Sequence, residues 1–349
     1  MSKQRNSLNK GRNQQTIKNI LVIGHSNIGD VCYDLTVINP LRSHFPQAKI
    51  SFLTSPRSKN IVEGYKGLDR ILTFYKDSRD RGLFGRLRFM TFLAREKFDL
   101  AVVLKSTLMY MLLGIPYVWS LRKYLGCAPS EKGMHIVDIY LEFLRSHGIA
   151  TSRATFDFTF NKEEHEFCDT FFTQEKISSK DRLVGILPMA AWSLKNWPVD
   201  KWNGLAELLI SQYAIKVVAF GKFSDDSYSQ MILNKISRKI ILAKNTTLKQ
   251  AMAMIKRCNI FIGVDSSLLH LASCMGVNTI GLYGATSTRY IYPYFHRYNV
   301  ITSKAKIDCM PCYPGHKPCY RKTESQVGVC MDGIGIDDVL RPVKQILGL

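Results

Sequence analysis

Short, almost wholly apolar runs alternate along the chain with longer segments in which apolar residues recur at helical spacing. Continuous apolar runs separated by helices are typical of parallel strands covered on both faces. These runs predict strands at 20–25, 50–54, 70–74 and 100–104, and again at 184–187, 216–220, 240–242, 260–264 and 279–283. Helical spacing predicts helices at 136–144, 201–211, 248–257 and 268–275.

A polar stretch at residues 173–182 separates the two series of strands. Each series is long enough to form a domain of its own. We therefore predict an α/β chain with a flexible basic tail (1–18) and two doubly wound domains, 19–175 and 183–349, that face each other across a cleft. Ligands of such domains bind outside the carboxyl ends of the strands.

The segment 106–121 is the part of the chain that could enter a membrane, because it is almost uncharged and mostly apolar. It is shorter than the roughly 20 residues that span a bilayer. It also contains Gly114 and Pro116, which interrupt a helix. We interpret it as a buried helix followed by a strand, and a shallow dip into lipid is the alternative.

The charge of the chain narrows its possible partners. Its 349 residues include 48 Lys and Arg against 28 Asp and Glu, a net charge of +20. This excess favours nucleic acid, phospholipid headgroups or a phosphorylated substrate, although many cytosolic proteins are simply basic. No apolar signal region follows the basic first 18 residues, which we interpret as a flexible tail, with an organellar transit peptide as the alternative. We therefore expect a cytoplasmic protein whose thiols are reduced or metal-bound.

The strongest local motif follows the predicted strand 260–264. Asp265, Ser266 and Ser267 lead directly into a helix, and His270 lies about one turn along it. Free backbone N–H groups and the helix dipole make such a start an anion-binding site. Ordinary N-capping explains the same residues equally well.

Two further loops follow predicted strands. Lys195 lies in a stretch that holds three of the four tryptophans, and it could place a positive charge on a phosphate or simply lie at the surface. The loop 24–30 opens a helix at Asp30 without a G-x-G-x-x-G pattern. Asp30 is either a helix cap or a carboxylate base that faces the cleft.

Together these three loops resemble those of glycosyltransferase family 9, the heptosyltransferases. The segments 282–286 and 135–144 add to the resemblance, which covers nearly the whole chain from residue 20. It implies two Rossmann-like domains of the GT-B type, the first binding the acceptor and the second the nucleotide sugar, commonly ADP-heptose. On the family's pattern Asp30 falls on the catalytic base. The donor-binding positions fall on Lys195, Asp225, Asp265, Ser266, Ser267, Leu268, His270 and Thr286.

The chain departs from the family pattern at three places. Ser267 and Met189 stand where the family has Gly, and Thr36 stands where it has Pro. These departures leave the exact donor and the acceptor open. No Asp-x-Asp motif occurs, so helix N–H groups and cationic side chains are expected to neutralise the leaving diphosphate without a metal cofactor.

A cysteine-rich loop, 309–330, holds Cys309, Cys312, Cys319 and Cys330. Four thiolates could close a structural zinc or iron site, and four reduced thiols that pack a loop are the alternative. Some relatives carry a similar segment, and protein-modifying heptosyltransferases bind iron there.

The function expected from the resemblance is an inverting, metal-independent transfer of heptose from ADP-heptose to a hydroxyl of a lipopolysaccharide core or related glycan. The alternatives are a protein-modifying heptosyltransferase, a non-catalytic relative that binds sugar nucleotides, and a basic nucleic-acid-binding protein. The expected partners are ADP-heptose or a similar nucleotide sugar, a phosphorylated lipid-linked acceptor, and the anionic inner membrane through peripheral contact on its cytoplasmic face.

Overall fold

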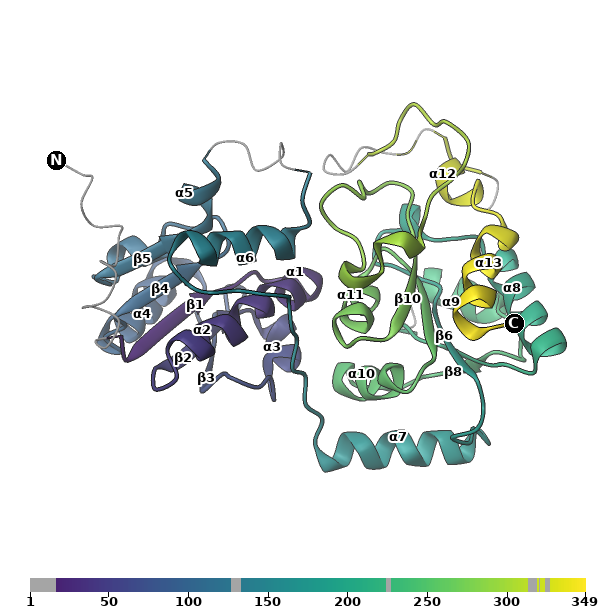
Figure 1. Cartoon of the computed structure of the whole chain (residues 1–349), viewed down its shortest axis with the longest axis horizontal. Coiled ribbons are helices and arrows are strands. Elements are labelled where there is room, and N and C mark those ends of the chain that lie inside the picture. Colours follow the sequence, from purple (N-terminus) through teal and green to yellow (C-terminus); the bar gives the residue numbers. More distant parts are fainter. Residues whose placement is uncertain (1–16, 127–132, 224–226, 313–318, 320, 324–326) are drawn as a thin grey trace. The chain divides into compact units, whose positions relative to one another are not determined.

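The computed structural model describes residues 17–126, 133–223, 227–312, 319, 321–323 and 327–349. The chain divides into two compact units, Met1–Thr159 and Phe160–Leu349 (Figure 1). Each unit is built on one wholly parallel sheet with helices on both faces. The predicted α/β class and the doubly wound architecture are therefore confirmed.

The first unit has a five-stranded sheet in the order β3-β2-β1-β4-β5. Its strands are β1 (Asn19–Ile23), β2 (Lys49–Thr54), β3 (Arg70–Thr73), β4 (Leu100–Val103) and β5 (Tyr117–Ser120). Its helices are α1 (Ile28–Asp34), α2 (Ile38–His44), α3 (Pro56–Val62), α4 (Gly82–Arg95), α5 (Leu121–Leu125) and α6 (Ile136–Ser146), with 3₁₀ turns η2 (Leu35–Val37) and η3 (Met109–Leu112).

Successive side chains of β1 point to opposite faces of this sheet, as in any strand. Leu21 and Ile23 join a core cluster that Phe89 and Leu93 of α4 close. Helices α1 and α6 contact each other. The crossover from β3 to β4 reverses the direction of the earlier crossovers, which places α4 on the face opposite α1 (Figure 1). Helices on both faces explain why the strands are apolar throughout.

The second unit has a six-stranded sheet in the order β11-β10-β9-β6-β7-β8. Its strands are β6 (Leu183–Leu187), β7 (Lys216–Ala219), β8 (Ile241–Leu242), β9 (Ile260–Val264), β10 (Asn278–Leu282) and β11 (Val300–Ile301). Its helical elements are α7 (Lys162–Gln174), η5 (Ser193–Lys195), α8 (Val199–Tyr213), α9 (Ser227–Lys235), α10 (Leu248–Lys256), α11 (Ser267–Cys274), η6 (Tyr294–Asn299), α12 (Val329–Asp332) and α13 (Ile336–Leu347).

The boundary between the units lies earlier than residue 175, where the polar stretch predicted it. Helix α7 packs against α10 inside the second unit. Arg257, just after α10, pairs with Asp169 at 2.6 Å and lies over the ring of Phe172. These contacts attach α7 to the second unit, so the division falls between Thr159 and Phe160.

The segment 106–121 is only half as predicted. Its strand is present as β5, but its buried helix is the single 3₁₀ turn η3. Tyr110 and Leu113 reach the core, whereas Leu108, Met111 and Leu112 are exposed. A single 3₁₀ turn of four residues can pack only one of its sides against the core, so the side chains on its other side stay exposed. In the part of the chain that the structure describes, no helix is long and apolar enough to cross a membrane.

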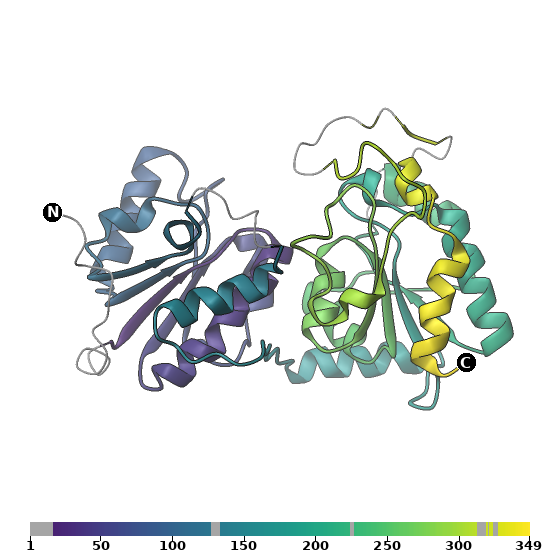
Figure 2. The ribbon, with the colours of Figure 1, turned by 45° about the horizontal axis from the view of Figure 1, so that its top comes forward.

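Two tryptophans anchor the loop after β6 in the core of the second unit. Trp197 and Trp202 are fully buried and meet edge to face, with ring centroids 5.0 Å apart. The indole nitrogen of Trp197 donates to the carbonyl oxygen of Ile334 at 3.0 Å, just before α13. Helix α13 packs along α8 (Figure 2). The loop is thus tied both to the helix that follows it and to the C-terminal helix.

We predict that Trp197→Phe destabilises the protein more than Trp202→Phe, by about 1–3 kcal/mol. Both substitutions remove a similar buried volume. Trp197→Phe also breaks a hydrogen bond, whereas the indole nitrogen of Trp202 has no hydrogen-bond partner among the described residues. Chemical denaturation of the two variants measures the difference. An equal loss, or a greater loss for Trp202→Phe, would contradict this account.

Candidate active site

The carboxyl ends of β6 and β9 bring a lysine, an aspartate and a histidine together. β6 and β9 are neighbours in register, with Leu187 opposite Gly263. The Nζ atom of Lys195 lies 2.5 Å from Oδ2 of Asp265, although the two residues are 70 positions apart. The Nε2 atom of His270, on the first turns of α11, lies 3.1 Å from the other carboxylate oxygen.

Asp265 is the centre of this Lys195–Asp265–His270 network and is only 6% exposed. Burial alone would raise its pKa, but the hydrogen bonds and charges of His270 and Lys195 outweigh burial and hold its pKa well below the ordinary value. Tyr283, at the end of β10, has its pKa raised by burial and by the negative charge of Asp265. Asp265 is therefore an ionised carboxylate that fixes the lysine ammonium at this edge of the sheet.

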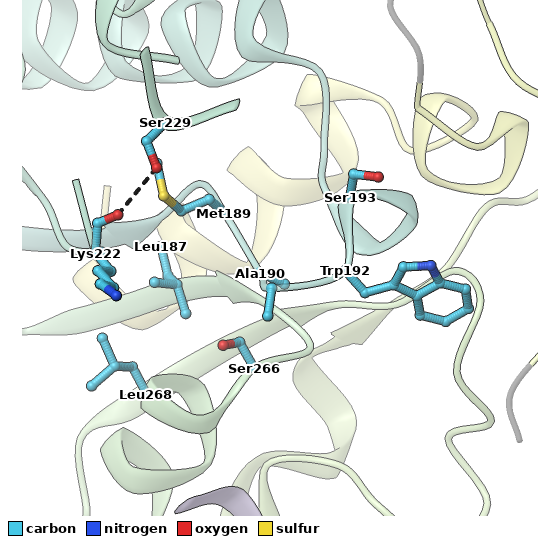
Figure 3. Close-up of a pocket in the computed structure, with 11 residues that line it drawn as sticks. Leu187, Met189, Ala190, Trp192, Ser193, Lys222, Ser229, Ser266 and Leu268 are labelled. Carbon is cyan, nitrogen blue, oxygen red and sulfur yellow. Dashed lines mark hydrogen bonds between the residues drawn. The ribbon is translucent and has the colours of Figure 1, made fainter. Parts of the chain in front are cut away.

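An open cavity of about 520 Å³ lies beside this network. Ser266 and Leu268 at the start of α11 lie on one side of it, and Met189 and Ser229 lie on the other (Figure 3). The first N–H groups of a helix have no intrahelical partner, and they carry the positive end of its dipole. The cavity therefore combines backbone donors with Lys222, the lysine that lines it, and backbone N–H groups with a lysine are the chemistry that binds phosphate groups.

Of the other residues expected to bind the donor, Ser267 is the first residue of α11 and is half-buried. Thr286 follows the neighbouring strand β10 and is buried, and its hydroxyl has no hydrogen-bond partner among the described residues. Met189 lines the cavity next to Gly221. A Cβ added at Gly221 would lie 3.2 Å from the Cγ atom of Met189. Asp225 lies outside the described residues.

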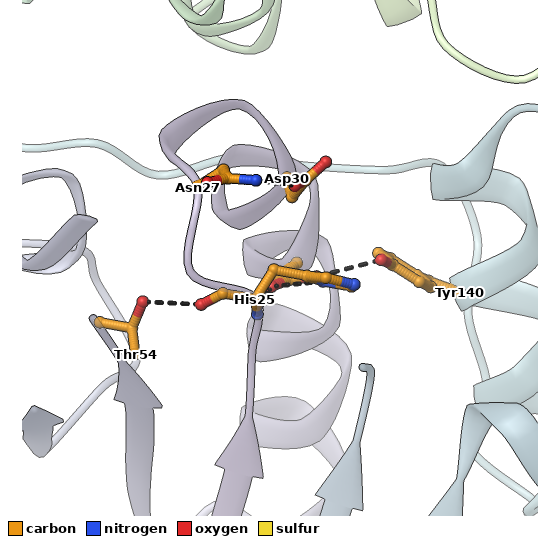
Figure 4. Close-up of polar contacts among 6 residues, drawn as sticks. His25, Asn27, Asp30, Thr54 and Tyr140 are labelled. Carbon is orange, nitrogen blue, oxygen red and sulfur yellow. Dashed lines mark hydrogen bonds and ion pairs between the residues drawn. The ribbon is translucent and has the colours of Figure 1, made fainter. Parts of the chain in front are cut away.

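In the first unit, the loop after β1 presents Asp30 on the first turn of α1. Asp30 is half-buried, and Oδ2 accepts a hydrogen bond from the side-chain amide of Asn27 at 3.2 Å. Figure 4 shows Asn27 and Asp30 at the tip of the loop and His25 deeper, between Thr54 and Tyr140. This arrangement leaves the Asp30 carboxylate available to a ligand.

A buried carboxylate supports that loop from below. Asp34 is fully buried and accepts hydrogen bonds from the backbone N–H of His25 at 2.6 Å and from the Tyr140 hydroxyl at 3.0 Å. The His25 ring lies 2.9 Å from the same carboxylate. Burial lowers the pKa of His25, but the charge of Asp34 and its hydrogen bond raise it by more, with a smaller contribution from Asp30. The His25–Asp34–Tyr140 network therefore holds a proton on His25 more tightly than the unfolded chain would.

Glycine is required at the entrance to this loop. A Cβ at Gly24 would lie 2.4 Å from the ring of Phe52 and 2.9 Å from Oδ2 of Asp34. The hydroxyls of Ser55 and Ser58 donate to the carbonyl oxygen of Ser26 at 2.6 and 2.9 Å. The loop is thus held by β2 and α3 as well as by Asp34.

A second cavity, of about 230 Å³, opens beside the loop at the same edge of the first sheet. Arg57 and Lys76 contribute its cations, and Ser26 and Asn27 belong to the loop itself. Asp77 also lines the cavity, so its cations exceed its acids by one, and this small excess favours an anionic ligand. No local motif indicates this cavity, because its walls come from three separate segments of the chain.

The cysteine-rich loop lies against the turn that follows β10. A Cβ at Gly284 would lie 2.7 Å from the sulfur of Cys330, and one at Gly328 would lie 3.1 Å from that sulfur and 4.0 Å from that of Cys319. Burial raises the pKa of Cys330 to about 11. In the described part of the chain, no three His, Cys, Asp or Glu side chains are arranged to hold a metal ion.

The buried residues that support the Asp30 loop, Asp34 and Tyr140, were not predicted from the sequence either. Asp34 lies one turn after Asp30 in an otherwise apolar helix, and a buried acid in such a helix is a signal that could have been noticed. Its partner Tyr140 is 106 residues away, and no local pattern indicates that contact.

Comparisons with known proteins agree with this geometry. The lipopolysaccharide core heptosyltransferase OpsX of Haemophilus influenzae is 20% identical over 304 residues, which cover 82% of this chain and 84% of that protein. A family 9 glycosyltransferase from Veillonella parvula superimposes with a TM-score of 0.78 at 19% identity, covering 95% of this chain and 97% of that one. The ADP-heptose lipopolysaccharide heptosyltransferase II of Escherichia coli superimposes with a TM-score of 0.70 at 21% identity, covering 94% and 98%.

The family profile described as glycosyltransferase family 9 (heptosyltransferase) matches residues 86–320, which is more than half of the chain. That match includes the Lys195–Asp265–His270 network and the cavity beside it. The chain belongs to glycosyltransferase family 9, the heptosyltransferases, and is a glycosyltransferase.

Proposed function

We propose that this glycosyltransferase moves a heptose from ADP-heptose to a hydroxyl of a lipopolysaccharide core acceptor, with inversion and without a catalytic metal. The observation that carries the proposal is the ionised Asp265, which fixes Lys195 beside a helix start and an open cavity of about 520 Å³. Ligand pockets for small molecules are typically about 300–1,000 Å³. The names of the relatives, which include lipopolysaccharide heptosyltransferases, support the donor and the acceptor class.

In the proposed complex the donor lies in the second unit. Lys195 and the first N–H groups of α11 neutralise the diphosphate, and the hydroxyls of Ser266, Ser267 and Thr286 add donors. Asp265 acts through Lys195, because it holds the ammonium group in place. Fixed donors and a fixed cation stabilise a leaving group without reorganising during the reaction.

In the proposed reaction Asp30 is the general base. The acceptor hydroxyl gives its proton to the Asp30 carboxylate, and the hydroxyl oxygen bonds to the anomeric carbon. The bond from that carbon to the diphosphate oxygen breaks, and ADP leaves with the electron pair. A single displacement from the opposite side inverts the anomeric configuration.

The cavity beside the Asp30 loop supports an anionic acceptor. Arg57 and Lys76 line it, and Asn27 joins it to Asp30 through its side-chain amide. A phosphorylated inner core carries the charges that these cations would bind. If the acceptor is lipid-linked, the enzyme must also reach a membrane surface.

We predict that Asp30→Asn lowers kcat by about 10²–10⁴-fold, because an amide cannot take the proton. Binding of ADP-heptose should be unchanged. Product formation from ADP-heptose and a truncated core acceptor is followed by mass spectrometry. Asp337→Asn, an exposed substitution on the first turn of α13, is the matched control and should keep full activity. Undiminished turnover in Asp30→Asn removes Asp30 from the mechanism, and no product from the unaltered enzyme refutes the proposed reaction.

We predict that Lys195→Met weakens ADP binding by roughly 10–150-fold, the usual effect of losing a hydrogen bond to a charged group. Adenosine, which lacks the diphosphate, should bind both proteins equally. Titration calorimetry with each ligand separates the two effects. Lys239→Met is the control, because Lys239 pairs with Glu207 at the surface. A parallel loss of adenosine and ADP affinity would show that Lys195 supports the fold and does not bind phosphate.

Two separate experiments test whether a metal takes part in catalysis and whether the four cysteines bind one. Dialysis against EDTA should leave turnover unchanged, because the proposed reaction uses no metal. Elemental analysis of the purified protein tests the structural zinc or iron site proposed for the four cysteines. About one equivalent of either metal would support that site, and its complete absence would leave the four cysteines as reduced thiols that pack the loop. Loss of turnover with EDTA, restored by a divalent cation, would contradict the metal-free mechanism.

A further inference from the structure

Exposed apolar side chains are concentrated in one part of the first unit. Nine large hydrophobic side chains are exposed in the described part of the chain, and seven of them lie between residues 83 and 112. The most exposed are Phe84 at 88% and Leu112 at 78%. An exposed hydrophobic residue by itself is ordinary, but a cluster of this size needs an explanation.

These side chains belong to two elements that share one core. The hydrophobic cluster on one face of the sheet includes residues from both elements. Helix α4 contributes Phe89 and Leu93, and the η3 segment contributes Tyr110 and Leu113. The outward residues of both elements therefore lie on the same side of the first unit. Six of the seven form what we call the apolar face: Leu83, Phe84, Leu87, Leu108, Met111 and Leu112. The seventh, Phe92, is only 37% exposed and lies under the guanidinium of Arg70.

The apolar face lies at the carboxyl edge of the sheet. Helix α4 starts after β3, so its first turn, with Leu83 and Phe84, lies near the end of that strand. The turn η3 follows the end of β4, which is parallel to the others. The loop that carries Asp30 follows β1 at the same edge. Both halves of the apolar face thus lie at the edge that bears the candidate catalytic residue.

Positive charge surrounds the apolar face. Helix α4 carries Arg86, Arg88 and Arg95 and has no acidic residue. Seven cations and three acids lie between residues 76 and 97. One of those acids, Asp80, is buried and already paired with Arg79 and Arg88. Arg86 and Arg95 make no ion pair within the described residues.

On the side of η3, three more cations lie near the carboxyl edge. Lys105 precedes the turn, and Arg122 and Lys123 follow β5 and are exposed. The Arg122 guanidinium lies 3.4 Å from the hydroxyl of Ser106, which places it beside the start of the η3 segment. Cations therefore lie on both sides of the exposed leucines and methionine.

We propose that the apolar face is a docking surface for an anionic lipid bilayer. Apolar side chains on a basic helix insert into the boundary between headgroups and acyl chains, and arginines reach the lipid phosphates. A neutral protein partner would suit the apolar residues but leave the surplus of cations unmatched. Binding of the bilayer by the apolar face does not depend on the identity of the acceptor proposed above.

The test is flotation of the full-length protein with lipid vesicles on a density gradient. Vesicles of phosphatidylethanolamine with phosphatidylglycerol supply the anionic surface, and phosphatidylcholine vesicles supply the neutral one. We expect binding to the first kind and much weaker binding to the second. Phe84→Ser combined with Leu112→Ser should lower the partition coefficient by about tenfold or more. Arg86→Glu should lower it about fivefold or more on anionic vesicles alone.

Matched controls lie in the second unit. Tyr298→Ser changes an aromatic side chain that is 78% exposed, and Arg238→Glu reverses an exposed arginine. Both should bind vesicles nearly as the unaltered protein does, and circular dichroism should be native for all variants. Equal losses in the controls would assign binding to the overall charge and overturn the proposal. It is also overturned if the unaltered protein does not float, or if Phe84→Ser changes the oligomeric state without lipid and leaves flotation unchanged.

Discussion

The ion pair between Lys195 and Asp265 is the interaction on which the candidate site of the second unit depends. It joins the ends of two neighbouring parallel strands, and His270 completes it from the helix that follows. A buried pair of this kind contributes little net stability, because desolvation opposes the attraction of the charges. Its effect is geometric, since it fixes a cation beside a helix start, where a phosphate would meet both.

In the first unit a buried carboxylate also organises the candidate site, but there it supports an acidic residue and not a lysine. There a buried carboxylate, Asp34, gathers a histidine, a tyrosine and a backbone N–H beneath the loop that carries Asp30. In both units the functional groups lie on loops, and the precision comes from strands and buried charges beneath them. Each loop follows a strand at the carboxyl edge of its sheet, where parallel sheets place their ligands.

Much of the fold could be predicted from the sequence, because strands buried on both faces are continuous apolar runs. The prediction was less successful where an element is short or lies at the margin of a unit. Strand β11 has two residues, η3 makes one exposed turn, and α7 joins the second unit through contacts with α10 that no local pattern indicates. Of the candidate site, Lys195, Asp265 and His270, which the family pattern indicated, lie together in the structure. The contact between Asp34 and Tyr140 was not, because it depends on how the chain folds back on itself.

The raised pKa of His25 links the shape of the Asp30 loop to acidity. The proton stabilises the folded state fully below the ordinary pKa of histidine, near 6.5, and this stabilisation is lost as pH rises through the higher pKa of the folded protein. Above that point Asp34 keeps its tyrosine and backbone donors but loses its cationic partner. A loss of activity at alkaline pH would then report the loosening of this scaffold beneath Asp30.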